Sequence, residues 1–188
     1  MVELQRICAG YPGKEVLRDL SLSFSDKGSY ALMAPSGYGK TTLLKVLGGL
    51  LPLSQGRITG LENKKVAFLF QEDRLLPWLT AEKNVEIVSS KEKARYWLGE
   101  MEIQDAHLFP DEMSGGMQRR IALARALAYG GDILLLDEPF KGLDEALRER
   151  IAARIKNAAP LIVLSVHDRE EAALMNAKII QLNQLAES

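Results

Sequence analysis

Four short apolar runs along the chain are not interrupted by charged residues. They span residues 30–33, 66–70, 133–136 and 161–164. A strand that is buried on both faces of a parallel sheet has this continuous pattern, whereas a half-exposed strand alternates between apolar and polar positions. Helical patterns lie between these runs, at residues 41–50, 115–129, 145–157 and 169–176. Strands that alternate with helices predict an α/β fold with a parallel sheet.

The N-terminal residues have a different pattern. Apolar and polar positions alternate over residues 16–24, with Val16, Leu20, Leu22 and Phe24 expected on one face. A Tyr-Pro-Gly-Lys sequence with the composition of a turn precedes them. We therefore predict an antiparallel pair of strands appended to the parallel core.

Residues 81–113 are charged and rich in helix-forming residues, and they end in a predicted loop at residues 109–112. This pattern indicates a small helical subdomain rather than a separate domain. A chain of 188 residues is close to the usual length of one domain, about 150 residues. We therefore expect a single domain over residues 1–188, with a core formed by residues 1–80 and 114–188.

Composition excludes several classes of protein. Hydrophobic residues make up 47% and charged residues 26% of the chain, which is ordinary for a globular protein and too apolar for a disordered one. The net charge of −1 provides no basic surface for nucleic acid. The single cysteine, Cys8, has no partner in the chain for a disulfide, which fits a reducing compartment. Residues 1–6 lack the apolar core of a signal peptide, so we expect none, and no apolar run approaches the roughly 18 residues that a membrane span needs.

The candidate chemistry begins directly after the first apolar run, where residues 34–42 read Ala-Pro-Ser-Gly-Tyr-Gly-Lys-Thr-Thr. Backbone N–H groups of a glycine-rich loop, together with the N-terminus of the following helix, can surround a phosphate. Lys40 can reach the β- and γ-phosphates, the Thr41 hydroxyl is the expected Mg²⁺ ligand, and Thr42 can contact the α-phosphate. The predicted phosphate-binding residues are Ser36, Gly37, Tyr38, Gly39, Lys40, Thr41 and Thr42.

One position departs from the G-x-x-x-x-G-K-[ST] pattern of such loops, because Ala34 stands where the first glycine is usual. A positive φ at this position would strain an alanine by about 1 kcal/mol. A negative φ would make the substitution harmless.

Two acids end the third apolar run, Asp137 and Glu138. A buried carboxylate needs a partner, and ligand sites of open α/β sheets lie at the carboxyl ends of the strands. Asp137 is therefore expected to contact Mg²⁺, directly or through water, and Glu138 to act as the general base on the attacking water. The alternative is a pair of surface acids that caps the next turn.

With these motifs, the sequence Met-Ser-Gly-Gly-Met-Gln at residues 113–118 makes the chain resemble the nucleotide-binding domain of an ABC (ATP-binding cassette) transporter. Ser114 suits a helix N-cap, and the N–H groups that follow it form a second anion site. The resemblance covers nearly the whole chain and implies a P-loop NTPase (RecA-like) core. It also implies Mg²⁺-dependent ATP hydrolysis and a homodimer on ATP binding, in which Ser114, Gly115 and Gly116 face the γ-phosphate held by the second copy.

The resemblance assigns four further positions. Tyr11 matches the aromatic residue that stacks on adenine, Gln71 the glutamine that touches Mg²⁺ and water, and His167 the histidine that holds the γ-phosphate. Asp144 matches the aspartate that touches the opposite subunit. The alternatives are a turn tyrosine, a surface glutamine, a structural histidine and a helix N-cap. His107 matches nothing and is expected at the surface.

Residues 70–80 indicate which branch of the ABC family the chain resembles. Their Leu-Leu-Pro-Trp-Leu-Thr sequence is similar to importers of the nitrate, sulfonate and taurine group, which includes importers of thiamine precursors. The resemblance implies an ATPase subunit on the cytoplasmic face of the cell membrane, with a separate permease and a solute-binding protein as partners. Leu75, Leu76 and Trp78 are either docking groups for the permease or apolar groups that pin the loop to the core.

A second function is also open, a degenerate cassette that binds ATP and acts as a regulatory or weakly active module. Three departures from the family pattern favour it. They are Ala34, the bulky Lys141 in the loop after the acidic pair, and a short helical subdomain.

Overall fold

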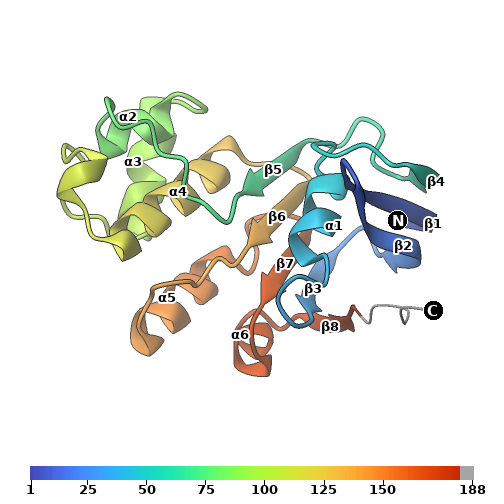
Figure 1. Ribbon diagram of the computed structural model, residues 1–188. Helices are drawn as coiled ribbons and strands as arrows, with labels where there is room; N and C mark the ends of the chain where they lie inside the picture. The colour runs from blue at the N-terminus through green and yellow to red at the C-terminus, as the bar shows by residue number, and fades with distance from the viewer. Residues whose placement is uncertain (183–188) are drawn as a thin grey trace.

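The computed structural model describes residues 1–182 and contains two sheets (Figure 1). The larger sheet has five parallel strands, in the order β5 (Val66–Leu69), β6 (Ile133–Asp137), β7 (Leu161–Val166), β3 (Gly28–Met33) and β8 (Lys178–Gln181). The smaller sheet is antiparallel, in the order β2 (Lys14–Phe24), β1 (Val2–Tyr11) and β4 (Gln55–Thr59). The predicted α/β fold with an appended antiparallel sheet is therefore confirmed.

Six α-helices and one 3-10 helix are found in the described residues. They are α1 (Lys40–Leu47), α2 (Ala81–Glu86), α3 (Lys91–Glu100), η1 (Pro110–Glu112), α4 (Gly115–Tyr129), α5 (Glu145–Ile155) and α6 (Arg169–Leu174). Helix α1 packs against both sheets, whereas α2, α3 and α4 pack on one another at the end of the molecule away from the smaller sheet (Figure 1). None of these helices is both long and apolar enough to cross a membrane.

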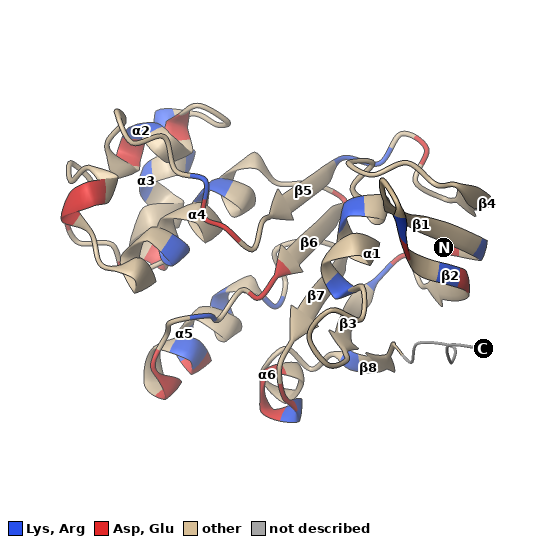
Figure 2. Ribbon diagram, in the orientation of Figure 1, with Lys and Arg blue, Asp and Glu red and all other residues tan. Residues whose placement is uncertain are grey.

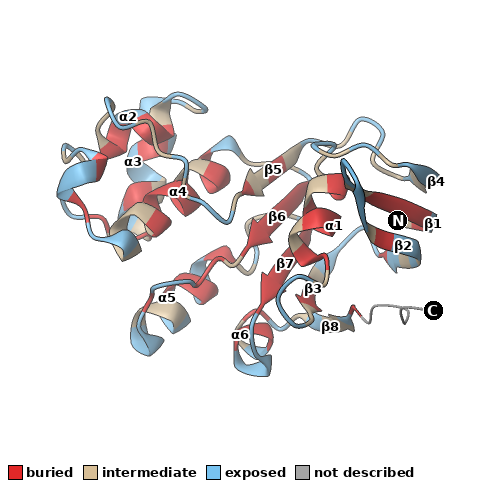
Figure 3. Ribbon diagram, viewed as in Figure 1, coloured by how far each residue is buried: buried red, intermediate tan, exposed pale blue. Residues whose placement is uncertain are grey.

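The central strands explain the continuous apolar runs. Every residue of β6 and β7 is buried, because helices cover both faces of the sheet (Figure 3). Strand β7 carries no Lys, Arg, Asp or Glu, and β6 carries one, Asp137 at its end (Figure 2). Some predicted bounds were too long. Helix α1 stops at Leu47 because Gly48 and the left-handed Gly49 follow it, and the predicted loop at residues 109–112 contains η1.

In β2 of the smaller sheet, one residue that was predicted to face inward does not. Leu17 is buried, while Val16, which was expected on the inner face, is only half-buried. The pairing of β1 with β2 shifts register at several points, and Asp19 has a positive φ of 45°. A bulge of this kind reverses the in-and-out alternation along a strand. Strand β4 was missed because its Gln-Gly-Arg-Ile-Thr sequence has no apolar pattern.

A buried asparagine fixes the loop at residues 71–80. The Asn84 side chain on α2 is fully buried. Its Oδ1 accepts the backbone N–H of Leu76 at 2.7 Å, and its Nδ2 donates to the carbonyl oxygens of Leu76 (3.1 Å), Leu79 (2.8 Å) and Thr80 (3.1 Å). Because one side chain satisfies four backbone groups, it sets the path of the whole loop.

Ion pairs join the helical part of the molecule to α5. Arg150 donates two hydrogen bonds to the Glu102 carboxylate, at 2.8 and 3.1 Å, and Arg154 pairs with Glu100 at 2.9 Å. The hydrogen bond from Arg150 lowers the pKa of Glu102 below its usual value. The helices around α4 are thus tied to the helix that follows the acidic pair.

Replacement of Asn84 by alanine is expected to lower the free energy of unfolding by about 2–3 kcal/mol, because it leaves buried backbone groups of the loop unpaired. Urea denaturation followed by circular dichroism measures this change. The matched control is Asn157→Ala, at an exposed position, which should leave the midpoint unchanged. Equal midpoints for both variants would contradict the role given to Asn84.

Candidate functional site

The loop between β3 and α1 depends on two glycines with left-handed backbones. Gly37 has a φ of 86° and Gly39 a φ of 88°. A Cβ at Gly39 would also lie 2.8 Å from Leu17 Cδ2, so a side chain is excluded there by both backbone and space. Gly39 is the N-cap of α1 and supplies no side-chain cap. The first N–H groups of α1 therefore remain available to an anion.

Lys40 folds back over this loop. Its Nζ donates to the carbonyl oxygen of Ala34 at 2.5 Å and of Pro35 at 3.4 Å, and the residue is buried. The ammonium group is therefore already held at the mouth of the loop. Thr41 is half-buried, whereas Thr42 is buried and is the less accessible of the two hydroxyls.

Ala34 carries no backbone strain. Ala34 is not among the described residues that have a positive φ. The Ala34 side chain packs against the core beneath the loop. Of the two alternatives for this departure from the motif, the harmless one is correct.

Asp137 is the last residue of β6, and only one of its two buried carboxylate oxygens has a hydrogen-bond partner in the described residues. Its Oδ1 accepts the hydroxyl of Ser165 on β7 at 2.7 Å. Its Oδ2 is buried, and no hydrogen-bond partner is found for it in residues 1–182. A buried carboxylate oxygen without a partner is costly, and Mg²⁺ prefers oxygen ligands. The chemistry of this oxygen therefore suits a Mg²⁺ ligand, as predicted for Asp137.

The carboxylate of Glu138 contacts the other two residues that were expected to act in catalysis, His167 and Gln71. Its Oε1 lies 3.3 Å from His167 Nε2 and accepts a hydrogen bond from Gln71 Nε2 at 3.4 Å. Its Oε2 lies 3.9 Å from Lys141 Nζ. Glu138 also has a positive φ of 52°, which is unusual for a residue with a side chain. Its backbone N–H donates to Ser165 Oγ at 2.8 Å, and this bond helps to hold the strained conformation.

Two buried residues of this site were missed by the sequence analysis. Ser165 bonds to both acids of the pair, and it lies directly opposite Asp137 in the pairing of β6 with β7. Arg119 on α4 donates to the carbonyl oxygens of Phe70 (2.7 Å), Asp137 and Glu138 (2.9 Å). The only sequence signal for Arg119 was a charged residue within a helix whose other inward positions are apolar.

The glycine-rich element lies apart from the loop at residues 34–42. Ser114 is the N-cap of α4 and accepts the N–H of Met117 at 3.2 Å. Gly115 and Gly116 line a cavity of about 500 Å³ together with Gln71 and Lys141. In the described residues, no hydrogen bond or ion pair joins this element to the loop at residues 34–42. The two predicted anion sites are therefore not bonded to each other within one chain.

Asp144 is the N-cap of α5, which was one of its two predicted roles. Its Oδ1 accepts the N–H of Leu147 at 2.9 Å, which begins α5. Tyr11 ends β1 with its ring partly exposed, and its hydroxyl accepts a hydrogen bond from Lys45 Nζ at 3.2 Å. His107, as expected, is exposed.

The comparison with known families decides the identity of this arrangement. Residues 17–141 match the family described as ABC transporter. The chain belongs to the ABC transporter family. The predicted family and P-loop NTPase fold are both confirmed.

Several members of the ABC family are similar over most of this chain. The aliphatic sulfonates import ATP-binding protein SsuB 1 of Pseudomonas savastanoi pv. phaseolicola is 35% identical over 180 residues, which cover 90% of this chain and 75% of that protein. The aliphatic sulfonates import ATP-binding protein SsuB of Delftia acidovorans is 36% identical, over 96% of this chain and 79% of that protein.

A solved structure of an ABC cassette has the same fold. The ATP-binding cassette MJ0796, in a dimeric post-hydrolysis state bound to ADP and Pi, superimposes with a TM-score of 0.86. Its sequence is 28% identical, and the match covers 97% of this chain and 94% of that one.

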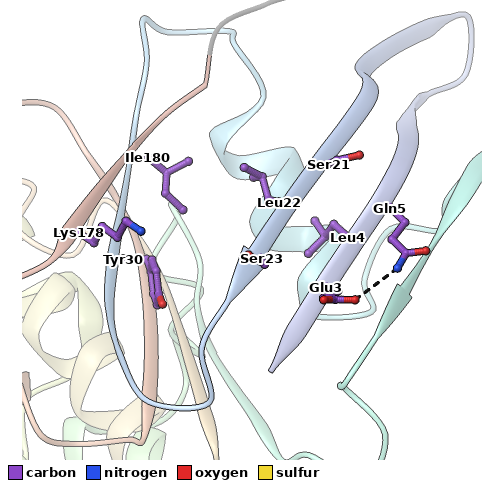
Figure 4. A pocket seen from close by; sticks show the side chains of 9 residues that line it. All are labelled: Glu3, Leu4, Gln5, Ser21, Leu22, Ser23, Tyr30, Lys178 and Ile180. Carbon is purple, nitrogen blue, oxygen red and sulfur yellow. Dashed lines mark hydrogen bonds between the residues drawn. The ribbon is translucent and has the colours of Figure 1, made fainter.

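A second cavity of this cassette, of about 530 Å³, contains none of the expected site residues. It lies between the two sheets, where Leu4 and Leu22 face Tyr30, Lys178 and Ile180 (Figure 4). Glu3 and Gln5 at its rim are hydrogen-bonded to each other at 3.3 Å, as the dashed line in Figure 4 marks. The predicted site residues therefore lie in other parts of the molecule.

Replacement of Ser165 by alanine is expected to lower the free energy of unfolding by about 1–3 kcal/mol, because the N–H of Glu138 and an oxygen of Asp137 lose their partner in the core. Urea denaturation measures the loss. Ser23→Ala, at an exposed position on β2, is the control. If Ser165→Ala is as stable as the control, the hydroxyl does not hold the acidic pair.

Proposed function

We propose that this chain is the ATP-binding and ATP-hydrolysing subunit of an ABC importer. The observation that carries the proposal is the convergence of Gln71 and His167 on the carboxylate of Glu138, the residue after Asp137, whose Oδ2 has no partner in residues 1–182. A positioned base with two polar side chains beside it suits the activation of water. The phosphate-binding loop would hold the γ-phosphate that the water attacks.

In the proposed reaction, residues 36–42 hold the phosphates of ATP. Glu138 takes a proton from the attacking water while the water oxygen bonds to the γ-phosphorus. The bond between that phosphorus and the bridging oxygen of the ADP leaving group breaks in the same step. Lys40 and His167 donate hydrogen bonds to the γ-phosphate oxygens, where negative charge is concentrated. Thr41, Asp137 and Gln71 would hold Mg²⁺, which, when bound, neutralises charge on the β- and γ-phosphates.

A second copy of the chain completes the site in this proposal. Ser114, Gly115 and Gly116 of that copy would face the γ-phosphate, and Asp144 would lie at the interface. Tyr11 would stack on the adenine ring. The separation of the two anion sites within one chain supports this arrangement, as does the dimeric state of the similar cassette. We further propose one ATPase domain, with residues 1–80 and 114–188 as its core and residues 81–113 as its helical subdomain.

The sulfonate-importer relatives support an importer role and a small anionic solute of that class. The permease would be a separate membrane protein, and a solute-binding protein would deliver the solute. Such a subunit would work on the cytoplasmic face of the membrane.

Two of the three candidate docking groups remain available to a permease. Leu75 packs against the core. Trp78, by contrast, is 69% exposed. Leu76 lines an apolar cavity of about 360 Å³, together with Ile87 and Tyr129. We propose that Trp78 and this cavity receive the permease.

One observation favours the alternative, a cassette that binds ATP and hydrolyses it only slowly. Lys141 Nζ lies 3.9 Å from Glu138 Oε2, so a flexible cation competes for the proposed base. Ala34 no longer supports this alternative, because its backbone is unstrained.

The substitution Glu138→Gln is expected to lower kcat for ATP hydrolysis by about 100-fold or more, because the amide cannot accept the proton of water. ATP binding should be retained, with a dimer visible on size-exclusion chromatography in the presence of ATP. Glu149→Gln, at an exposed position on α5, is the control. A Glu138→Gln variant that turns over ATP at the wild-type rate would falsify the base assignment. ATP binding with almost no turnover in the wild-type chain would instead support the slow cassette.

The substitution Trp78→Ala is expected to weaken binding of the chain to its detergent-solubilised permease by about tenfold or more, because a large aromatic anchor is lost. Tyr96→Ala is the matched control, since Tyr96 is an exposed aromatic residue on α3. Binding is measured by surface plasmon resonance. Equal affinities for the two variants would show that Trp78 is not the docking group.

A further inference from the structure

A buried carboxylate supports the backbone of His167. Glu171 lies in the first turn of α6, and its side chain is almost fully buried. Its Oε2 accepts the backbone N–H of His167 at 3.0 Å. Its own N–H donates to Asp168 Oδ1 at 2.8 Å, which caps α6. The carboxylate thus sits directly over the point where the chain leaves β7.

The second oxygen of this carboxylate faces α5. Arg148 Nη1 on α5 lies 3.8 Å from Glu171 Oε1. The Nε of Arg148 is buried, and no hydrogen-bond partner is found for it in the described part of the chain. Because a buried carboxylate requires compensation, the guanidinium on α5 and the N–H of His167 act together on Glu171.

The imidazole of His167 depends on this backbone support. Its side chain is 53% exposed, so packing by neighbours does not fix its direction. Its recorded side-chain contact is the one from Nε2 to Glu138 Oε1, at 3.3 Å. The position of the ring is therefore set by the backbone from which it projects, and a displacement of about 1 Å is enough to impair catalysis.

We propose that Glu171 is a positioning residue for His167, and that Arg148 links it to α5. The hydrogen bond from the N–H of His167 to Glu171 holds the imidazole beside Glu138. The ion pair with Arg148 connects the same carboxylate to the helix that Asp144 begins. This inference rests on the proposed ATP hydrolysis, since it assigns Glu171 a role in that reaction.

Steady-state ATPase kinetics test the positioning role. Glu171→Ala is expected to lower kcat by about tenfold, because a charge-assisted hydrogen bond is lost, with less than a twofold change in KM for ATP. Glu171→Gln keeps an acceptor oxygen for the N–H of His167 and should retain kcat to within about threefold. Glu170→Gln, at the exposed neighbouring position, should behave as wild type. A similar loss in Glu171→Ala and Glu171→Gln, or a loss only in KM, would overturn the proposal.

Amide hydrogen exchange, measured by ¹⁵N NMR on the nucleotide-free chain, tests the contact without any turnover. Exchange at the His167 amide is expected to be about tenfold faster in Glu171→Ala and unchanged in Glu171→Gln. Unchanged exchange in Glu171→Ala would overturn the proposal, whatever the turnover. If exchange responds as expected but the wild type hydrolyses no ATP, the proposed function fails and the contact stands.

Arg148→Ala keeps the proposal testable if Glu171→Ala does not fold. It is expected to lower kcat about twofold to threefold and to speed exchange at the His167 amide by a similar factor, since it removes one partner of the carboxylate. If neither quantity changes, the link to α5 does not exist.

Discussion

The candidate site depends on a carboxylate that the sheet buries without fully satisfying. Asp137 is the last residue of a strand whose other residues are apolar and buried, so its side chain has no access to bulk water. Only one of its two oxygens has a partner in the described residues. A group of this kind is retained at a cost in stability, and the natural compensation is a cation that arrives with the ligand. The surrounding structure then has to hold this carboxylate in place.

Register in the parallel sheet provides that placement. Asp137 pairs with Ser165 across β6 and β7, so one hydroxyl can reach both the carboxylate and the backbone N–H of Glu138. A slip of one residue would turn Ser165 to the other face of the sheet and remove both bonds. Arg119 acts on the other side of the same turn, where it binds the carbonyl oxygens of Asp137 and Glu138. The left-handed backbone of Glu138 is thus held from two sides.

Much of this fold could be predicted from the sequence, because each prediction used local information. Continuous apolar runs predicted the buried strands, and the glycine-rich sequences around Lys40 and Ser114 predicted the starts of α1 and α4. The roles of Asn84, Arg119 and Ser165 could not be predicted, since each depends on backbone groups that are distant in the sequence or on the register between strands. The bulge near Asp19 belongs to the same class, because a local pattern does not record where a partner strand shifts register.

Two of the three departures from the family pattern, Ala34 and Lys141, have different consequences because different atoms matter at the two positions. At Ala34 the loop uses the carbonyl oxygen, which accepts a hydrogen bond from Lys40, and any residue with a negative φ can supply it. At Lys141 the side chain itself matters, because it places a positive charge 3.9 Å from Oε2 of the proposed base. A substitution in a backbone-lined loop is therefore silent when the dihedral angles allow it. A substitution that brings a charge within 4 Å of a carboxylate changes the electrostatics of the site even when the backbone is unchanged.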